Sequence, residues 1–225
     1  MPDVIGRDEL ERRLARVVAA EQRKQLNELL ALLGDPPDPA RIPAEFWETQ
    51  GAALRSAVEP VLRDVYLAQA QTVLSEISIG IDWAVANQNA IDWARKYTFD
   101  LVKGITDGNR QLLQTALGDY FQNPTTIGDL SDKLSGAYGP VRAETISVTE
   151  ITRSAAEGEQ VVVDRLIQDN PGIEAVETWQ TNKDDRVCPI CGPRQGKARG
   201  TNWTENPPAH PRCRCWKKID FRRKA

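Results

Sequence analysis

The four cysteines and the single histidine of this 225-residue chain all fall within one short segment near its carboxyl end. Cys188 and Cys191 form a C-x2-C pair, and His210, Cys213 and Cys215 form an H-x2-C-x-C group. Zinc prefers sulfur and imidazole ligands supplied as short chelating pairs that a loop brings together, and this spacing provides them. The segment therefore predicts a metal site that fixes the fold of the chain around it.

Five candidate ligands exceed the four that a structural zinc ion takes in a tetrahedron. Cys188 and Cys191 supply the first pair. The second pair is His210 with Cys213, His210 with Cys215, or the two cysteines with His210 outside the ligand set, and the sequence leaves these alternatives open. Because protein side chains can fill every ligand position, the spacing favours a structural ion over a catalytic one.

Two disulfides are the alternative use of four cysteines. Disulfides need an oxidising compartment, and the first residues of the chain include acidic side chains but no apolar stretch of the kind that directs secretion. A disulfide framework also gives His210 no role. We therefore expect a zinc site in a protein made in the cytoplasm.

Apolar residues make up 40% of the chain and charged residues 27%, which is typical of a soluble protein with a core of moderate size. The longest apolar runs fall well short of the roughly 20 residues that a membrane-spanning helix requires. We therefore expect no membrane partner.

The charge of the chain is unevenly distributed. Residues 181–225 contain twelve Lys or Arg and four Asp or Glu, a net charge of +8, whereas the whole chain carries −3. These cations either contact DNA or an acidic protein face, or they offset thiolate charge at the metal site. The basic residues considered for such contact are Arg212, Arg214, Lys217, Lys218, Arg222, Arg223 and Lys224.

Apolar residues recur at helical spacing through most of the chain. Residues 7–34 predict a long amphipathic helix, and the proline-rich residues 35–43 predict a stiff linker, so that residues 1–34 would act as an arm. The body, residues 44–170, is expected to contain helices over 44–57, 60–79, 82–102, 106–121, 125–135 and 140–170.

The composition of the sequence changes at Pro171. Residues 173–179 alternate as in a strand, and glycine, proline, tryptophan and cysteine dominate the chain after them. We expect residues 171–225 to form a small zinc-pinned module with one or two hairpins and a basic tail. The predicted fold class is mainly α, a multi-helix body with a C-terminal zinc knuckle of α+β type.

Three segments carry a further pattern. The first is Gly104-Ile-Thr-Asp-Gly108, the second runs from Arg142 to Gly158, and the third runs from Trp179 to Cys215. In this order they resemble the phage head morphogenesis proteins, the minor capsid proteins similar to protein F of phage Mu. The likeness covers about residues 105–215, and the third segment is the most specific part of it.

The resemblance implies a virion protein, not an enzyme, that acts in assembly of the head of a tailed double-stranded DNA phage. It would lie near the portal, after synthesis in the bacterial cytoplasm. The portal, scaffold or major capsid protein would be its partner. The third segment also contains Trp179, Thr181, Asp185 and Arg186, which we expect to brace the metal site by contacts and hydrogen bonds.

The second segment contains a possible interaction face. Glu150, Arg153 and Glu157 are spaced i, i+3 and i+7, so Arg153 can bridge both carboxylates along one side of a helix. Such a face is either a solvated row of ion pairs or a docking surface for a portal or scaffold protein.

Two other function classes are the alternatives to an assembly protein. One is a nucleic-acid-binding zinc module on a helical scaffold, which the basic carboxyl end favours. The other is a zinc enzyme, a nuclease or a transferase. Known zinc-enzyme motifs argue against it, because Pro211 and Arg212 follow His210 where a deaminase would have H-x-E, and one histidine cannot form H-E-x-x-H.

Overall fold

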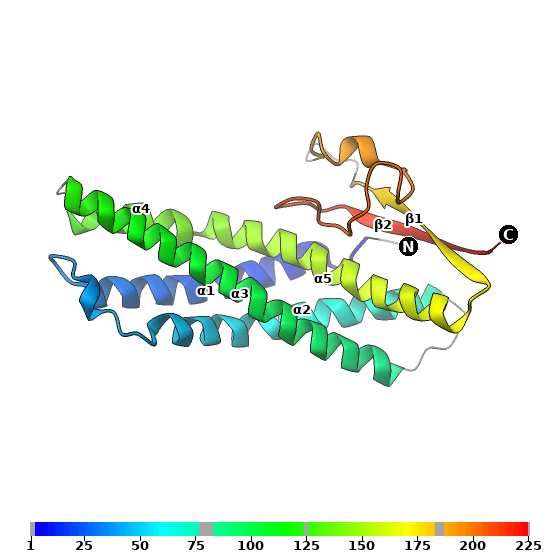
Figure 1. Cartoon of the computed structure of the whole chain (residues 1–225), viewed down its shortest axis with the longest axis horizontal. Helices are drawn as coiled ribbons and strands as arrows, with labels where there is room; N and C mark the ends of the chain where they lie inside the picture. Colours follow the sequence, from blue (N-terminus) through cyan, green and yellow to red (C-terminus); the bar gives the residue numbers. More distant parts are fainter. Residues whose placement is uncertain (1–2, 77–82, 124–125, 183–186, 225) are drawn as a thin grey trace. The chain divides into compact units, whose positions relative to one another are not determined.

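The computed structural model describes residues 3–76, 83–123, 126–182 and 187–224 (Figure 1). Within these ranges the chain forms five α-helices, two short 3-10 helices and two strands. The predicted fold class is confirmed: the protein is mainly helical, with a small C-terminal two-stranded sheet and a Cys/His cluster. None of the described helices combines the length and the apolar character that a membrane crossing requires.

The chain divides into two compact units, each assembled from segments far apart in the sequence. Unit 1 comprises residues 1–11, 61–93 and 145–225, and unit 2 comprises residues 12–60 and 94–144. The ranges expected from the sequence, 1–34, 35–43, 44–170 and 171–225, do not coincide with these units. The difference arises because long helices carry the chain from one unit to the other.

Helix α1 spans Arg7–Leu33, as its apolar spacing predicts, and ends at Gly34, whose φ of 71° is left-handed. It is not an arm. Leu29 and Leu33 are fully buried in the core of unit 2, in contact with residues of α2, α3 and α4. An apolar helix face of this length is stable only when other helices bury it. The linker after α1 contains a 3-10 helix, η1 (Pro39–Arg41).

Helix α2 spans Phe46–Glu76 without interruption, so the expected break before Pro60 is wrong. A proline inside a helix removes one backbone hydrogen bond and crowds the preceding turn. Here Val58, Val61 and Leu62 are buried on both sides of Pro60. Their packing keeps the helix continuous.

Helix α3 spans Trp83–Gln122, so the predicted break between residues 102 and 106 is also wrong. Gly104 and Gly108 lower helix propensity in this region. Val102, Ile105 and Asn109 are nevertheless buried at helical spacing, and one interior face therefore continues through both glycines.

Helices α4 (Ile127–Tyr138) and α5 (Pro140–Asp169) lie close to their predicted ranges. A capping box between Thr126 and Asp129 starts α4, and its buried residues Leu130 and Leu134 join the core of unit 2. In unit 1, Val162 and Leu166 of α5 pack with apolar residues of α2.

The two strands pair across a long connection. Strand β1 (Ile173–Gln180), at the predicted position, runs antiparallel to β2 (Trp216–Arg223), with Gln180 opposite Trp216 (Figure 1). The expected hairpin therefore has the whole segment 181–215 as its connection, and this segment contains all the candidate metal ligands. Pairing of the two strands therefore brings the two ends of the metal-binding segment together.

Candidate metal centre

The first ligand pair lies on a tight turn. The N–H groups of Cys191 and Gly192 donate to the Cys188 carbonyl oxygen at 3.1 and 3.0 Å, and the Cys191 N–H also lies 3.3 Å from the Cys188 sulfur. These bonds turn both thiols to the same side. The 3-10 helix η2 (Gly192–Arg194) follows and carries the chain away from the cluster.

The second ligand group also lies on a turn, and α5 holds it. The Cys213 N–H donates to the His210 carbonyl oxygen at 3.2 Å. Arg212, inside this turn, has a φ of 62°, a left-handed conformation that residues other than glycine rarely adopt. Its N–H donates to the Thr149 hydroxyl oxygen at 2.9 Å. The bond to α5 helps to hold the turn in this unusual geometry.

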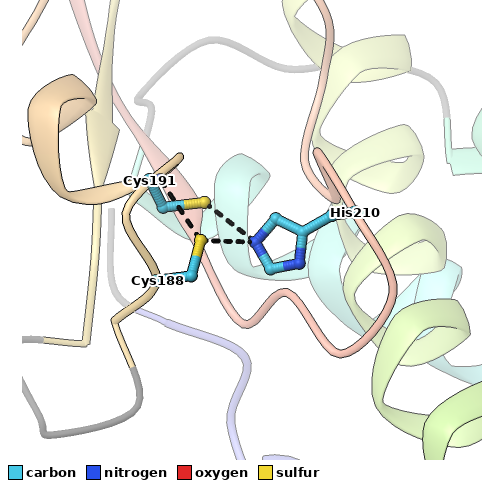
Figure 2. Close-up of side chains that lie close together, drawn as sticks. All are labelled: Cys188, Cys191 and His210. Atoms are coloured by element: carbon cyan, nitrogen blue, oxygen red, sulfur yellow. Dashed lines mark hydrogen bonds between the residues drawn. The ribbon is translucent and has the colours of Figure 1, made fainter.

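The imidazole of His210 points at the first pair of sulfurs (Figure 2). Its Nε2 lies 2.9 Å from the Cys188 Sγ and 3.2 Å from the Cys191 Sγ, while its Nδ1 lies 2.8 Å from the Pro211 carbonyl oxygen. Because a carbonyl can only accept, the proton belongs on Nδ1. The lone pair of Nε2 then faces the sulfurs, as in histidines that bind metal.

Cys213 and Cys215 complete the cluster from the other side. Their sulfurs lie within 4.8 Å of each other and of the Cys191 Sγ, and the Cys191 and Cys213 sulfurs are 3.8 Å apart. Two thiolates on one tetrahedral zinc ion are separated by about the same distance, roughly 3.8 Å. The structure thus brings all five predicted ligands together, with the four cysteines as free thiols, in a cluster that could hold a metal ion.

Cys191 is the shared member of the cluster. It belongs both to the group with Cys188 and His210 and to the group with Cys213 and Cys215. Hydrogen bonds with the Cys213 and Cys215 sulfurs, together with burial, raise the pKa of Cys191 above its usual value. Buried sulfurs this close cannot all ionise without a counter-charge. A divalent cation bound between these sulfurs would supply one.

Of the residues predicted to brace the site, Trp179 packs against the cysteines, whereas the described contacts of Thr181 are with Gln195. Trp179 is fully buried in the apolar cluster that contains Cys191, and its ring centroid lies 5.2 Å from that of Trp203. The N–H and the hydroxyl of Thr181 both donate to the Gln195 Oε1, at 2.6 and 2.7 Å. The other two predicted residues, Asp185 and Arg186, lie outside the described residues.

Two cations of the basic end form ion pairs with acidic residues of unit 1. Lys217 is fully buried and donates to Glu177 at 2.9 Å. The Nε of Arg214 lies 3.1 Å from the Glu11 Oε1, and its guanidinium also pairs with Asp8. The prediction that these two residues offer charge to an external partner is therefore wrong. Acidic side chains of the same unit neutralise them.

The other cations of the basic end are more accessible. Lys218 and Arg222 are exposed and form surface pairs with Asp220 and Glu174, at 2.9 and 2.6 Å. Arg223 and Lys224 at the end of β2 are also exposed. The guanidinium of Arg212 lies 3.5 Å from the Thr145 hydroxyl.

The predicted face on α5 is not a fully solvated row. The Glu150 side chain is only 7% exposed, and its carboxylate lies 3.4 Å from the Arg153 Nε. Glu157 is partly buried. The interpretation of these residues as solvated ion pairs is therefore wrong at Glu150, because the Glu150 side chain points into the interior of the protein.

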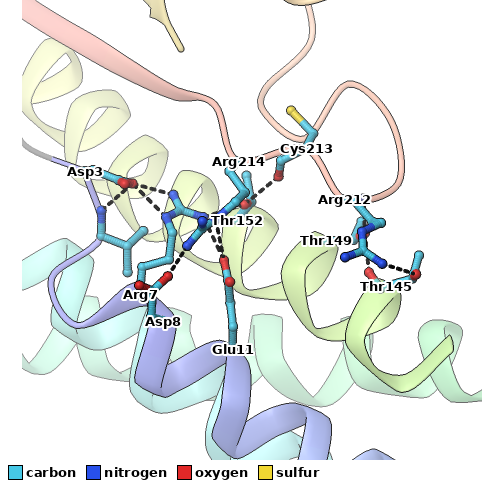
Figure 3. A network of polar contacts seen from close by, with 11 residues as sticks. Asp3, Arg7, Asp8, Glu11, Thr145, Thr149, Thr152, Arg212, Cys213 and Arg214 are labelled. Atoms are coloured by element: carbon cyan, nitrogen blue, oxygen red, sulfur yellow. Dashed lines mark hydrogen bonds and ion pairs between the residues drawn. The ribbon is translucent and has the colours of Figure 1, made fainter. Parts of the chain in front are cut away.

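Sequence reasoning missed the α5 hydroxyl groups that hold the metal-binding segment. The Thr152 hydroxyl donates to the Cys213 carbonyl oxygen at 2.8 Å and accepts from the Arg7 guanidinium at 2.7 Å (Figure 3). The available signal was the spacing of Thr145, Thr149 and Thr152, which places three hydroxyl groups on one side of a helix.

The first two segments of the phage-type pattern meet inside unit 2. The Arg142 guanidinium donates to the Asn109 Oδ1 at 2.9 Å, and the Asn109 amide donates to the Gln25 Oε1 at 3.0 Å. Arg142 also lies beside Gly108. The start of the second segment is therefore bonded to α3 next to the first segment.

Comparison with models of known protein families, with curated proteins and with solved structures gave no match for this chain. The likeness to phage head proteins thus rests on its three sequence segments.

Proposed function

We propose that this chain is a minor head protein that acts in head morphogenesis of a tailed double-stranded DNA phage. It would bind the portal, the scaffold or the major capsid protein without covalent chemistry. The observation that carries the proposal is the segment from Trp179 to Cys215. Its sequence resembles the terminal segment of that protein class, and its five candidate ligands form two three-residue groups that share Cys191.

The proposed metal is a structural zinc ion. Sulfur and imidazole donors suit zinc, the sulfur spacing fits a tetrahedral site, and His210 presents the required nitrogen. The surrounding segment is rich in glycine, proline and charged residues, so its own apolar core is small. Zinc binding would therefore contribute folding free energy to a module that is too small to fold without it.

The proposed location is the virion head near the portal, after synthesis in the bacterial cytoplasm. Binding surfaces on the helices and on the metal module would position the protein during assembly. The exposed cations Lys218, Arg222, Arg223 and Lys224 suit the acidic face of a partner.

The proposal is tested with the portal protein encoded in the same genome. Co-expression should yield a complex that survives size-exclusion chromatography, and mass spectrometry should detect the chain in purified particles. Deleting its gene should reduce the yield of filled heads. If particles lack the protein and heads form normally without it, the proposal fails.

A nucleic-acid-binding module is the second candidate, because the exposed cations Lys218, Arg222, Arg223 and Lys224 lie close together in sequence near the end of the chain. The internal pairing of Lys217 and Arg214 leaves fewer cations for phosphate contacts than the sequence suggests. Affinity for duplex DNA that falls steeply with added salt, in a protein that does not bind portal, would favour this candidate.

A further inference from the structure

We propose that the metal centre locks the N-terminal strap, residues 3–11, which includes the first residues of α1 (7–11), onto unit 1, so that metal loss releases the strap and frays this end of α1. The proposal rests on metal binding by the cluster and is independent of a role in head assembly. The strap belongs to unit 1, as do the metal-binding segment and the C-terminal part of α5. Figure 3 shows the contacts that join the three.

The first contact passes through Arg214. This residue lies between two candidate ligands, Cys213 and Cys215, so metal binding on either side fixes its backbone. Its guanidinium pairs with Asp8 and lies 3.1 Å from the Glu11 Oε1. The Arg214 and Glu11 side chains are 17% and 12% exposed. Water therefore screens this pair less than a surface pair, and it holds the strap more firmly.

The second contact passes through Thr152 of α5. Its hydroxyl donates to the Cys213 carbonyl oxygen at 2.8 Å and accepts from the Arg7 guanidinium at 2.7 Å. One side chain thus bonds a candidate ligand residue and the strap together. A shift of the Cys213 backbone would remove the acceptor that orients the hydroxyl toward Arg7.

The strap is organised around Arg7, whose side chain is 5% exposed. Its guanidinium bonds Asp3 at 2.5 Å, and the Asp3 carboxylate also accepts from the Val4 N–H at 2.7 Å. Loss of the Thr152 bond would leave this buried guanidinium short of an acceptor, which favours its exit into water.

The strap also covers part of α2. Val4, Ile5 and Leu10 of the strap line a groove of about 420 Å³ together with Val65, Gln69 and neighbouring residues of α2. Release of the strap would remove one wall of this groove and expose more of α2 to solvent. In this proposal, metal binding therefore sets how much of one side of α2 is covered.

The test compares hydrogen–deuterium exchange of the full-length protein in three states. These are the zinc-loaded protein, the chelator-treated protein, and zinc-loaded Arg214→Gln, which keeps all five candidate ligands. The reporters are amides of the strap, since those of Arg7, Glu9 and Leu10 donate to carbonyl groups within it. The control variant is Arg222→Gln, whose exposed ion pair with Glu174 involves neither the strap nor a candidate ligand.

Strap amides should exchange roughly ten-fold faster or more after metal removal and in zinc-loaded Arg214→Gln, the order of magnitude expected for one lost charge-assisted hydrogen bond. Amides of α4 should exchange as before, and Arg222→Gln should match the unmodified protein. Thr152→Val, which removes the shared hydroxyl, should loosen the strap in the same way.

Metal content is measured on each sample, which separates failure of the lock from failure of metal binding. Unchanged strap exchange in Arg214→Gln and Thr152→Val at one zinc per chain overturns the lock. Unchanged strap exchange after complete metal removal overturns it equally. A preparation that never binds metal removes its foundation and the zinc part of the proposed function together.

Discussion

The backbone of Gly158 in α5 lies directly against the Tyr66 carbonyl group in α2, and a methyl group at Gly158 would overlap the carbonyl oxygen. The closest atoms all belong to the Tyr66 main chain, so rotation of a side chain cannot relieve the overlap. This glycine is the last residue of the second phage-type segment. Its physical role is to let two helices of unit 1 approach closely.

Replacing Gly158 with alanine should therefore destabilise the protein by about 2 kcal/mol, the range seen when a packed interior is overfilled. The matched control is Gly118→Ala, at an exposed position in α3 where a methyl group meets no neighbour. That change should stabilise by about 0.5 to 1 kcal/mol, because alanine favours the helix. Urea denaturation measures both, and equal effects would contradict the close approach.

Cys191→Ser should weaken metal binding more than Cys188→Ser or Cys215→Ser, because Cys191 belongs to both ligand groups. Metal analysis after dialysis against a weak chelator ranks the three variants. In Cys191→Ser, exchange protection should disappear over residues 173–223 while α4 stays protected, since folding of the module depends on the ion. One equivalent of zinc retained by Cys191→Ser would refute the shared-ligand assignment.

Glu159 should make stability depend on pH. Burial raises the pKa of this carboxyl group to about 7 from 4.5, although the charge of Lys217 and a 2.6 Å hydrogen bond from Gln69 oppose the shift. A raised folded pKa means that the contribution to stability is complete below about 4.5 and is lost as the pH rises through about 7.

Glu159→Gln keeps the acceptor for Gln69 and removes the charge. It should be more stable than the unmodified protein at pH 8, by up to about 3 kcal/mol, and the difference should shrink to about 1 kcal/mol at pH 5. Urea denaturation at the two pH values gives the difference. Parallel pH profiles for the two proteins would show that Glu159 does not titrate in this range.

Lys217 and Lys218 are neighbours on β2 with opposite environments. The Lys217 side chain is fully buried and bonds Glu177, whereas Lys218 is 51% exposed. Lys217→Met should destabilise by about 3 kcal/mol, because it leaves part of a buried negative charge uncompensated. Lys218→Met should change stability by less than about 0.5 kcal/mol. Thermal unfolding compares the pair, and similar midpoints would mean that Lys217 is not in the interior.

Features with a local cause were predictable from the sequence. The helix from Arg7 to Leu33 follows from its apolar spacing and its terminal glycine, and the strand from Ile173 follows from its alternation. The Cys/His cluster was predictable because chelating spacing is itself a local pattern. The ligand pairs come together as this spacing predicts.

Features that depend on tertiary packing could not be read in the same way. Pro60 and the glycines of α3 are local helix breakers, and only the buried residues around them explain why the helices continue. The ion pairs of Lys217 and Arg214 involve partners such as Glu177 and Glu11, which lie far away in the sequence. The net charge of the sequence suggests a free basic tail. Lys217 and Arg214 nevertheless form ion pairs with acidic residues of the same unit.

Strand β2 begins at the residue directly after Cys215, the last candidate ligand. Side chains of a strand alternate between its two faces, so adding or deleting one residue at this junction would turn Lys217 outward and bring a neighbour into its place. If the cysteine stayed in its cluster, the strand would lose its register with Glu177. If the strand kept its register, the cysteine would leave the cluster. The number of residues between the last candidate ligand and the buried lysine is therefore constrained from both sides.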